Sequence, residues 1–206
     1  MLRILLSSLA YLCRGDFLFK LKIKYSFIIL ATVSILFWDL RLIICAVIGM
    51  ALHEAAHIIC AKIYEYDIKS LELSAQGLTI DFNDNPTGYK NLLILMSGPM
   101  MNLTVSAILF LWHGNHLQSP ATFNLSFGLF NLLPMRFLDG GRILEEILEC
   151  VFPLNISVRI CKYVNTFLLC VTWCFSIYCF LFESTHSSSM FFCVFALINL
   201  CLDDSF

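Results

Sequence analysis

Long apolar runs separated by short polar segments divide the chain. A helix that crosses a bilayer needs about 20 mostly apolar residues, and several of the runs approach that length. The pattern therefore predicts a mainly α, polytopic membrane protein with about six transmembrane helices, of which the first and the last are the shortest. The predicted spans are residues 25–38, 42–63, 91–113, 121–137, 162–182 and 190–202.

A different pattern separates the second and third predicted spans. Polar residues alternate with leucines over residues 70–74, and the same period of two returns over residues 78–83. Such alternation is typical of a strand with one buried face, and Gln76-Gly77 between the two stretches is a turn signal. The sequence therefore predicts a small β-hairpin between the second and third spans.

The composition supports an integral membrane protein. Apolar residues make up 59% of the 206 residues and charged residues 14%, and the mean hydropathy is +0.82. A soluble domain of this size does not need so many apolar residues. The net charge of −2 provides no basic surface for phosphates, which argues against nucleic acid as a partner and leaves the lipid bilayer as the environment.

The first 24 residues differ from the rest of the chain. Their apolar run is interrupted by two serines after Leu6, which argues against a cleaved signal peptide. Leu5, Leu9 and Leu12 would instead lie on one side of a helix at the membrane interface. We therefore predict an N-terminal cytoplasmic or interfacial segment, residues 1–24, and a membrane-embedded domain, residues 25–206.

The lysines and arginines predict the orientation of the chain. Six spans place the connecting segments alternately on two sides of the membrane, and cytoplasmic segments carry the excess of Lys and Arg. The side that does not hold the termini has only Arg41. The side that holds both termini has the other twelve: Arg3, Arg14, Lys20, Lys22, Lys24, Lys62, Lys69, Lys90, Arg136, Arg142, Arg159 and Lys162. Both termini are therefore predicted to be cytoplasmic, in a multi-pass protein of the cell membrane.

The second predicted span carries three ionisable residues that need a physical reason. The stretch HEAAH places His53, Glu54 and His57 close together, and an ionisable group in hydrocarbon costs on the order of 2.5–3.5 kcal/mol on insertion scales. Residues four apart share one face of a helix, so both imidazoles can bind one metal ion while Glu54 reaches a water on that ion. This pattern indicates a zinc hydrolase with Glu54 as the general base.

A catalytic zinc site normally has three protein ligands and an open fourth position, so a third donor must come from elsewhere in the chain. Asp139 stands out. Pro134 interrupts the fourth predicted span and Gly140-Gly141 allows a tight turn, which would place Asp139 at membrane depth in the same half as the histidines. The other carboxylates stay open as candidates: Glu65, Asp67, Glu72, Asp81, Asp84, Glu145, Glu146 and Glu149.

Three stretches resemble the signature elements of one family. HEAAH (53–57), SGPMMN (97–102) and FNLLPMRFLDGG (130–141) occur in the order found in the site-2 proteases, the membrane-embedded zinc metalloproteases of regulated intramembrane proteolysis. The resemblance covers most of residues 25–202, with the hairpin in the expected place. Ala56 departs from the glycine that the family often has there, which affects helix packing rather than metal binding.

The resemblance implies a role for each candidate site residue. Glu54 would be the catalytic base. Asn131 and Pro134 would line the substrate path, with Asn131 as a hydrogen-bond donor to the substrate or the developing oxyanion. The ligands of one zinc ion per chain would be His53, His57 and Asp139.

The middle stretch, SGPMMN, also has a purely structural interpretation. Ser97 and Gly98 are small enough to let two helices approach closely, and neighbouring helices can tolerate Pro99. Both interpretations can hold at once.

The sequence therefore predicts an intramembrane zinc metalloendopeptidase that cleaves in or near transmembrane segments of membrane-associated substrates. A substrate in extended form could add to the hairpin as a strand. Because the chain ends without a PDZ or CBS module, it resembles the sporulation protease that processes a pro-sigma factor. Two alternatives stay open, a membrane metalloprotease of another H-E-x-x-H class with a glutamate as third ligand and a non-catalytic zinc-binding membrane protein. A regulatory membrane protein and a second copy of the chain are further candidate partners.

Overall fold

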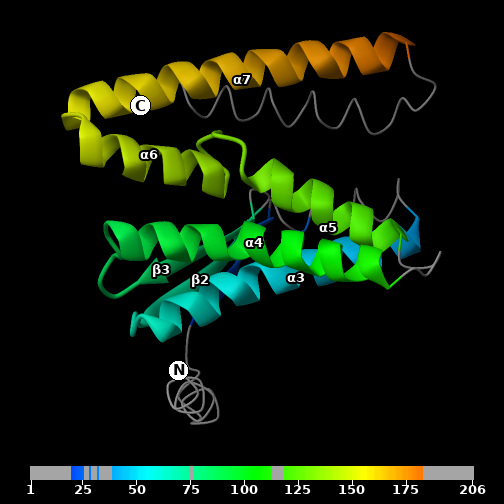
Figure 1. The fold of residues 1–206 in the computed structure, drawn as a ribbon, viewed down its shortest axis with the longest axis horizontal. Coiled ribbons are helices and arrows are strands. Elements are labelled where there is room, and N and C mark those ends of the chain that lie inside the picture. The colour runs from blue at the N-terminus through cyan, green and yellow to red at the C-terminus, as the bar shows by residue number, and fades with distance from the viewer. Residues whose placement is uncertain are drawn as a thin grey trace. The chain divides into compact units, whose positions relative to one another are not determined.

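The computed structural model describes residues 20–25, 28, 32, 39–74, 77–112 and 118–182. Over these residues the chain is mainly helical, as predicted, with one small sheet (Figure 1). The helices are α3 (Leu40–Ile63), α4 (Tyr89–Leu111), α5 (Gln118–Asn131), α6 (Asp139–Val151) and α7 (Leu154–Phe182), and the strands are β1 (Lys20–Ile23), β2 (Ile68–Ser74) and β3 (Gly77–Phe82).

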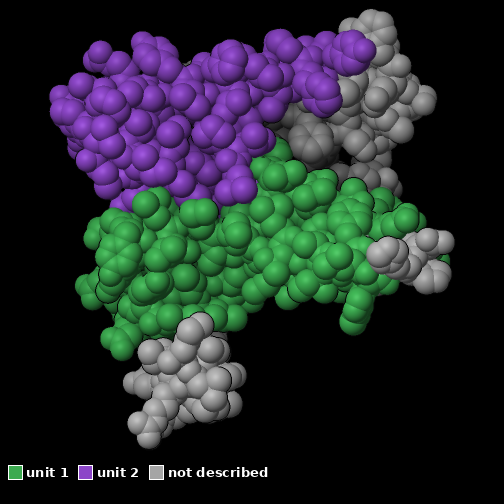
Figure 2. Space-filling view, in the orientation of Figure 1, with its two compact units in different colours: residues 1–130 green, residues 131–206 purple. Residues whose placement is uncertain are grey.

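The chain forms two compact units, which Figure 2 shows in different colours. Unit 1 is Met1–Phe130 and contains the sheet, α3, α4 and all of α5 except its last residue. Unit 2 is Asn131–Phe206 and contains α6 and α7. The division predicted at residue 24, between an interfacial segment and a membrane domain, stays a prediction.

Three helical stretches in the described ranges are long and apolar enough to cross a membrane: Leu40–Ile63, Tyr89–Leu111 and Leu154–Phe175. They match the second, third and fifth predicted spans. The first and the last predicted spans lie almost entirely outside the described residues. Six transmembrane helices are therefore not confirmed.

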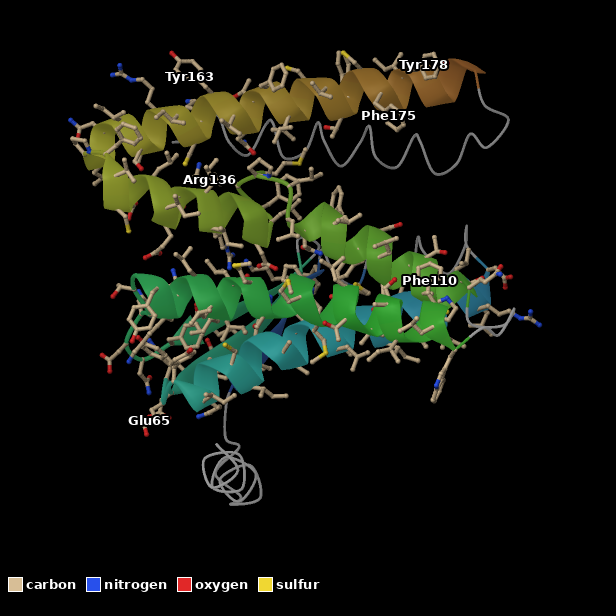
Figure 3. All side chains as sticks on the ribbon, viewed as in Figure 1. Glu65, Phe110, Arg136, Tyr163, Phe175 and Tyr178 are labelled. Carbon is tan, nitrogen blue, oxygen red and sulfur yellow. The ribbon has the colours of Figure 1, made fainter. Side chains whose placement is uncertain are left out.

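The last of these helices, α7, carries large aromatic side chains on its surface. Tyr163, Phe175 and Tyr178 are 70%, 66% and 58% exposed, and Figure 3 shows them projecting from the ribbon. Exposed side chains of this size on a helix of high hydropathy suit contact with lipid.

The fourth predicted span, residues 121–137, is wrong at its end. The helix found there, α5, has 14 residues and stops at Asn131, which makes it about 21 Å long and shorter than the roughly 30 Å hydrocarbon core. Pro134 lacks a backbone N–H and its ring excludes a continuing helix. The apolar run therefore forms a helix followed by a loop, which ends where α6 begins.

The predicted hairpin is confirmed, and a third strand joins it. β2 and β3 pair antiparallel, with Leu71 opposite Ile80. β1 pairs in parallel with the other edge of β2. Lys20–Ile23 alternates lysine with apolar residues, a period of two that the prediction of one interfacial segment over residues 1–24 overlooked.

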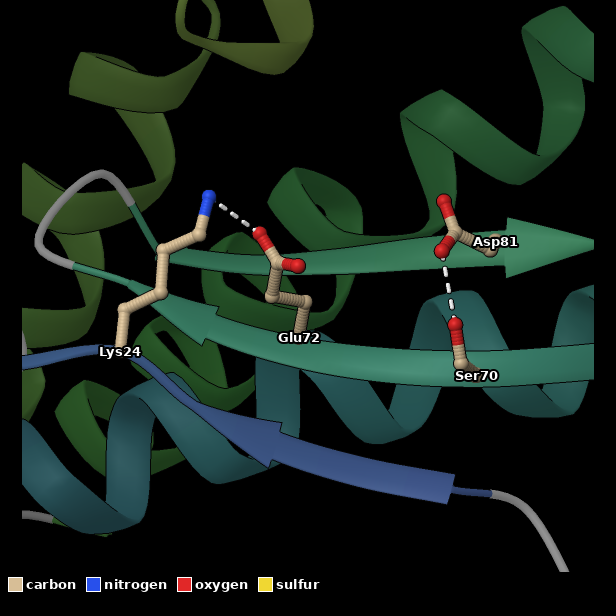
Figure 4. A network of polar contacts seen from close by, with 4 residues as sticks. All are labelled: Lys24, Ser70, Glu72 and Asp81. Carbon is tan, nitrogen blue, oxygen red and sulfur yellow. Dashed lines mark hydrogen bonds and ion pairs between the residues drawn. The ribbon is translucent and has the colours of Figure 1, made fainter.

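Two polar contacts join the strands (Figure 4). Lys24, just after β1, pairs with Glu72 Oε1 at 2.5 Å, and Ser70 Oγ donates to Asp81 Oδ2 across the hairpin at 2.7 Å. An exposed ion pair adds only about 0.2–1 kcal/mol, so these contacts set the strand register more than they stabilise the sheet. They also engage two of the carboxylates that were open as third metal ligands.

Small residues let the helices of unit 1 pack closely. α3 and α4 lie along each other. A side chain at Gly49 of α3 would come within 2.8 Å of the Phe123 ring on α5, and one at Gly128 of α5 would come within 3.1 Å of the Pro99 carbonyl on α4. Close approach through small residues is the usual way for helices to associate in a bilayer, where burial from water does not drive them together.

In unit 2, Gly140 and Gly141 seat the start of α6 against the loop before it. A side chain at Gly140 would overlap the carbonyl of Leu132, and one at Gly141 would overlap the carbonyl of Met135. The Met135 side chain is itself only 1% exposed. These glycines therefore fix the loop relative to Asp139, the first residue of the helix.

Candidate metal centre

His53 and His57 lie one turn apart on the same face of α3, and they are 3% and 6% exposed. Their rings meet edge to face, with 4.8 Å between the centroids. The two Nε2 atoms are 3.1 Å apart. The spacing in HEAAH therefore brings one nitrogen of each ring to the same place, as the sequence predicted.

The other nitrogen of each ring has an oxygen partner on α4. His53 Nδ1 lies 2.7 Å from Asn102 Oδ1, and His57 Nδ1 lies 2.7 Å from the carbonyl oxygen of Ile94. Because a carbonyl oxygen only accepts, His57 Nδ1 carries its hydrogen. Asn102 donates through Nδ2 to the Gly49 carbonyl at 3.0 Å, so its Oδ1 faces the imidazole and His53 Nδ1 carries a hydrogen too.

The convergence of the two Nε2 atoms fits a bound metal ion. With both Nδ1 atoms bonded to oxygens of α4, the Nε2 atoms are the nitrogens that would bind a metal ion, and they lie 3.1 Å apart. Two nitrogens held at about 2.0–2.1 Å by a tetrahedral zinc ion would lie roughly 3.3 Å apart. Histidines that bind metal also normally donate their other N–H to an oxygen, as both do here.

Gly98 of the SGPMMN stretch lies directly against the histidine pair. A Cβ at this position would come within 2.6 Å of His53 Nε2 and would also collide with His57 Nε2. The interpretation of SGPMMN as a close helix contact is therefore confirmed, and the contact is with the Nε2 edges of the two rings.

Replacing Gly98 by alanine is expected to disturb the metal centre. The added methyl group needs space that both Nε2 atoms fill, so a ring must rotate or α4 must shift. We expect zinc affinity to fall at least tenfold, within the range of about 10–100-fold seen when the surroundings of a ligand change. Chelator competition on protein purified in detergent measures this. Met100→Ala, on the exposed side of the same helix, should keep the affinity of the natural chain, and an unaltered Gly98→Ala affinity would contradict the packing argument.

The remaining predicted site residues are found in both units. Glu54 is half-buried on α3. Asn131 ends α5 and is 8% exposed, while Pro134 and Asp139 are half-buried in unit 2. Of the proposed metal ligands, His53 and His57 converge within unit 1, and Asp139 begins α6 in unit 2.

The sequence analysis gave no individual role to Asn102 or Asn124. Both are almost completely buried, at 0% and 3% exposed, and Asn102 Nδ2 donates to Asn124 Oδ1 at 2.8 Å. The sequence did contain a signal for both residues, because an amide side chain inside an apolar helix needs a hydrogen-bond partner. The identity of that partner depends on how distant helices pack.

Comparisons with known proteins point to one family. The model of Peptidase family M50 matches residues 112–175. Stage IV sporulation protein FB of Bacillus subtilis (strain 168) is 22% identical over 160 residues, which cover 71% of this chain and 56% of that protein, so the chain spans little more than half the length of this curated relative. The Site-2 Protease from Methanocaldococcus jannaschii has the same fold, with a TM-score of 0.63 and 24% identity, over 85% of this chain and 88% of that one.

The buried histidine pair on an apolar helix and the M50 match over residues 112–175 are both features that this chain shares with membrane metalloproteases. Within that class, the family match and the sporulation relative support the site-2 protease family for this chain, and the archaeal structure agrees in fold. The resemblance that HEAAH, SGPMMN and FNLLPMRFLDGG carry is therefore confirmed.

Proposed function

We propose that the chain is an intramembrane zinc metalloendopeptidase that hydrolyses peptide bonds in or near transmembrane segments of membrane-associated proteins. The observation that carries this proposal is the pair of imidazole nitrogens 3.1 Å apart, buried on a helix of membrane-spanning length. Polar ligands at such a position are costly unless they serve a site. The match to Peptidase family M50 supports the same class of reaction.

The proposed ligands of one zinc ion are His53, His57 and Asp139. The Nε2 atoms of the two histidines converge, and two imidazoles with one carboxylate form a donor set that zinc accepts. Three protein ligands leave a fourth position for water or substrate, as a catalytic site requires.

Glu54 is proposed to move the proton. Zinc, when bound, lowers the pKa of its water toward about 7 and polarises the carbonyl that is attacked. Glu54 adjoins His53 in the chain, so its carboxylate can take the proton of the attacking water and pass it to the leaving amine nitrogen. The hydrogen bonds of His53 to Asn102 and of His57 to Ile94 keep both rings from rotating.

Asn131 and Pro134 are proposed to line the substrate path. The amide of Asn131 offers an N–H to a carbonyl oxygen on which negative charge develops. Pro134 keeps the chain after α5 out of a helix, which leaves that segment free to run beside an extended substrate.

An extended substrate is proposed to join the sheet as an additional strand. A helical segment hides its carbonyls in its own hydrogen bonds, and pairing with a sheet edge replaces those bonds while it exposes the scissile carbonyl. The edge of β2 away from β3 is already paired with β1. Within the described sheet β3 pairs only with β2, so the outer edge of β3 is the edge that we assign to the substrate.

We place the chain in the cell membrane with both termini in the cytoplasm, because nearly all of its lysines and arginines then fall on the cytoplasmic side. The substrate is then a membrane protein, or a protein attached to the membrane, whose cleavage site reaches the cytoplasmic half of the bilayer. Since the curated relative is a sporulation protein, sporulation proteins are the first substrates to test. A regulatory membrane protein and a second copy of the chain are proposed further partners.

Zinc analysis of the chain purified in detergent tests this proposal. Elemental analysis should find one zinc ion per folded chain. Removal of zinc by a chelator should lower the unfolding temperature, because an ion that binds only the folded state stabilises it, by about 2.7 kcal/mol when free zinc is 100 times the Kd. A folded chain that takes up no zinc at any concentration would contradict the proposal.

A further inference from the structure

We infer that Asn124 of α5 is a positioning residue for the metal centre. It acts through Asn102 of α4 to hold His53 in the tautomer that carries its hydrogen on Nδ1, so that Nε2 is the nitrogen that would bind a metal ion. The inference rests on the proposed function, because it assigns another residue to the proposed zinc site.

A chain of hydrogen bonds connects α5 to the imidazole of His53. Asn124 Nδ2 donates to the carbonyl oxygen of Pro120 at 2.8 Å, and Asn124 Oδ1 accepts from Asn102 Nδ2 at 2.8 Å. The same Nδ2 donates to the Gly49 carbonyl at 3.0 Å. Asn102 Oδ1 then accepts from His53 Nδ1 at 2.7 Å.

The two backbone carbonyls fix the direction of every bond in this chain. A carbonyl oxygen only accepts, so the nitrogen of the Asn124 amide must face Pro120 and its oxygen must face Asn102. Asn102 thereby uses both amide hydrogens, on Asn124 and on Gly49, and turns its oxygen toward the ring. His53 must meet that oxygen with an N–H on Nδ1, which leaves the lone pair on Nε2 for the metal.

Burial makes these hydrogen bonds costly to break. Asn102, Asn124 and His53 are 0%, 3% and 3% exposed, so a broken bond cannot be replaced by bulk water. A Cβ at Gly49 would come within 3.3 Å of Asn124 Oδ1, which shows how tightly the amide is enclosed. Without Asn124, one Asn102 hydrogen loses its acceptor, and Gly49 is the only acceptor left to fix the direction of the Asn102 amide.

Ser106 offers a matched comparison, because it joins the same two helices without reaching a histidine. Its hydroxyl is 1% exposed and donates to the carbonyl of Ala121 at 2.8 Å. If Asn124 only fastened α5 to α4, its loss and the loss of the Ser106 hydroxyl would affect the protein in the same way.

The experiment measures zinc affinity by chelator competition on full-length variants purified in detergent. Asn124→Leu keeps most of the side-chain volume and removes the amide, and we expect about a tenfold loss of affinity. Asn102→Leu should lose about 10–100-fold, as is typical when the partner of a metal-binding histidine is removed. Ser106→Ala should stay within about twofold of the natural chain, even where its unfolding temperature falls as far as that of Asn124→Leu.

The double variant tests whether Asn124 acts through Asn102. If it does, Asn124→Leu adds less than about twofold to the loss of zinc affinity already caused by Asn102→Leu, because Asn124 has no hydrogen-bonded route to His53 once the Asn102 amide is gone. Losses that multiply in the double variant overturn the inference. So does an Asn124→Leu chain that binds zinc as tightly as Ser106→Ala.

Asn124→Ser is the second variant, for use where leucine prevents folding. Its hydroxyl can still donate to the Pro120 carbonyl but is too short to replace the oxygen at Asn102, so the same loss is expected and an unchanged affinity overturns the inference. A natural chain that binds no zinc overturns the proposed function and this inference together. Zinc binding that is insensitive to Asn124 overturns the inference alone.

Discussion

Replacing Glu54 by glutamine is expected to abolish cleavage and to leave one zinc ion bound per chain. Glutamine has the size of glutamate but cannot accept a proton, and a positioned general base typically contributes about 10²–10⁴-fold to the rate. Glu54 is not one of the proposed ligands, so zinc content and unfolding temperature should stay those of the natural chain.

The activity of this variant can be measured before any substrate is known. Membrane proteomes of cells that produce the natural chain or Glu54→Gln are compared, and proteins that accumulate at full length only with the variant are substrates. Glu65→Gln is the matched control, since it makes the same change at an exposed residue just after α3 (Figure 3). Unaltered function of Glu54→Gln, with zinc bound, would favour the non-catalytic zinc-binding protein over the peptidase.

Replacing Asp139 by alanine is expected to release the zinc ion. Loss of one of three ligands should lower the zinc affinity by more than the roughly 10–100-fold that is typical when the hydrogen-bond partner of a ligand is removed. Asp139 also lies in the first turn of α6, where a negative charge favours the helix by about 0.3–1 kcal/mol. A second variant, Asp139→Asn, keeps the shape of the side chain and is measured beside Asp139→Ala. The zinc content of each is measured on protein that unfolds cooperatively.

Two glutamates on the same helix provide the controls for Asp139. Glu145→Ala and Glu146→Ala should each keep one zinc ion per chain. The reverse pattern, with zinc kept in Asp139→Ala and lost in one of the glutamate variants, would identify the other class of H-E-x-x-H membrane metalloprotease. The same measurement thus distinguishes two kinds of third ligand.

The histidine pair could be predicted because its geometry is local. A long, mostly apolar run indicated a helix over residues 42–63, and α3 occupies Leu40–Ile63. Once His53 and His57 lie on one helix, their separation of four residues is enough to bring the rings together. No knowledge of the surrounding helices was needed for this part of the site.

The partners of the histidines could not be predicted in the same way. Asn102 lies 49 residues after His53, and Asn124 lies another 22 residues on. Helices that are apolar on every side carry no periodicity that tells which face meets which neighbour. β1 was missed for a related reason, since a strand of four residues that pairs with a distant strand leaves only a weak pattern.

The two oxygens that hold the histidines both belong to α4, at Ile94 and Asn102. They are separated by about 12 Å along the helix axis at 1.5 Å per residue. Sliding α4 along α3 by one turn would break both hydrogen bonds at once and would push a bulkier neighbour of Gly98 into the rings. The register of α4 along α3 is therefore fixed at the depth of the histidines, because one displacement would disrupt three contacts together.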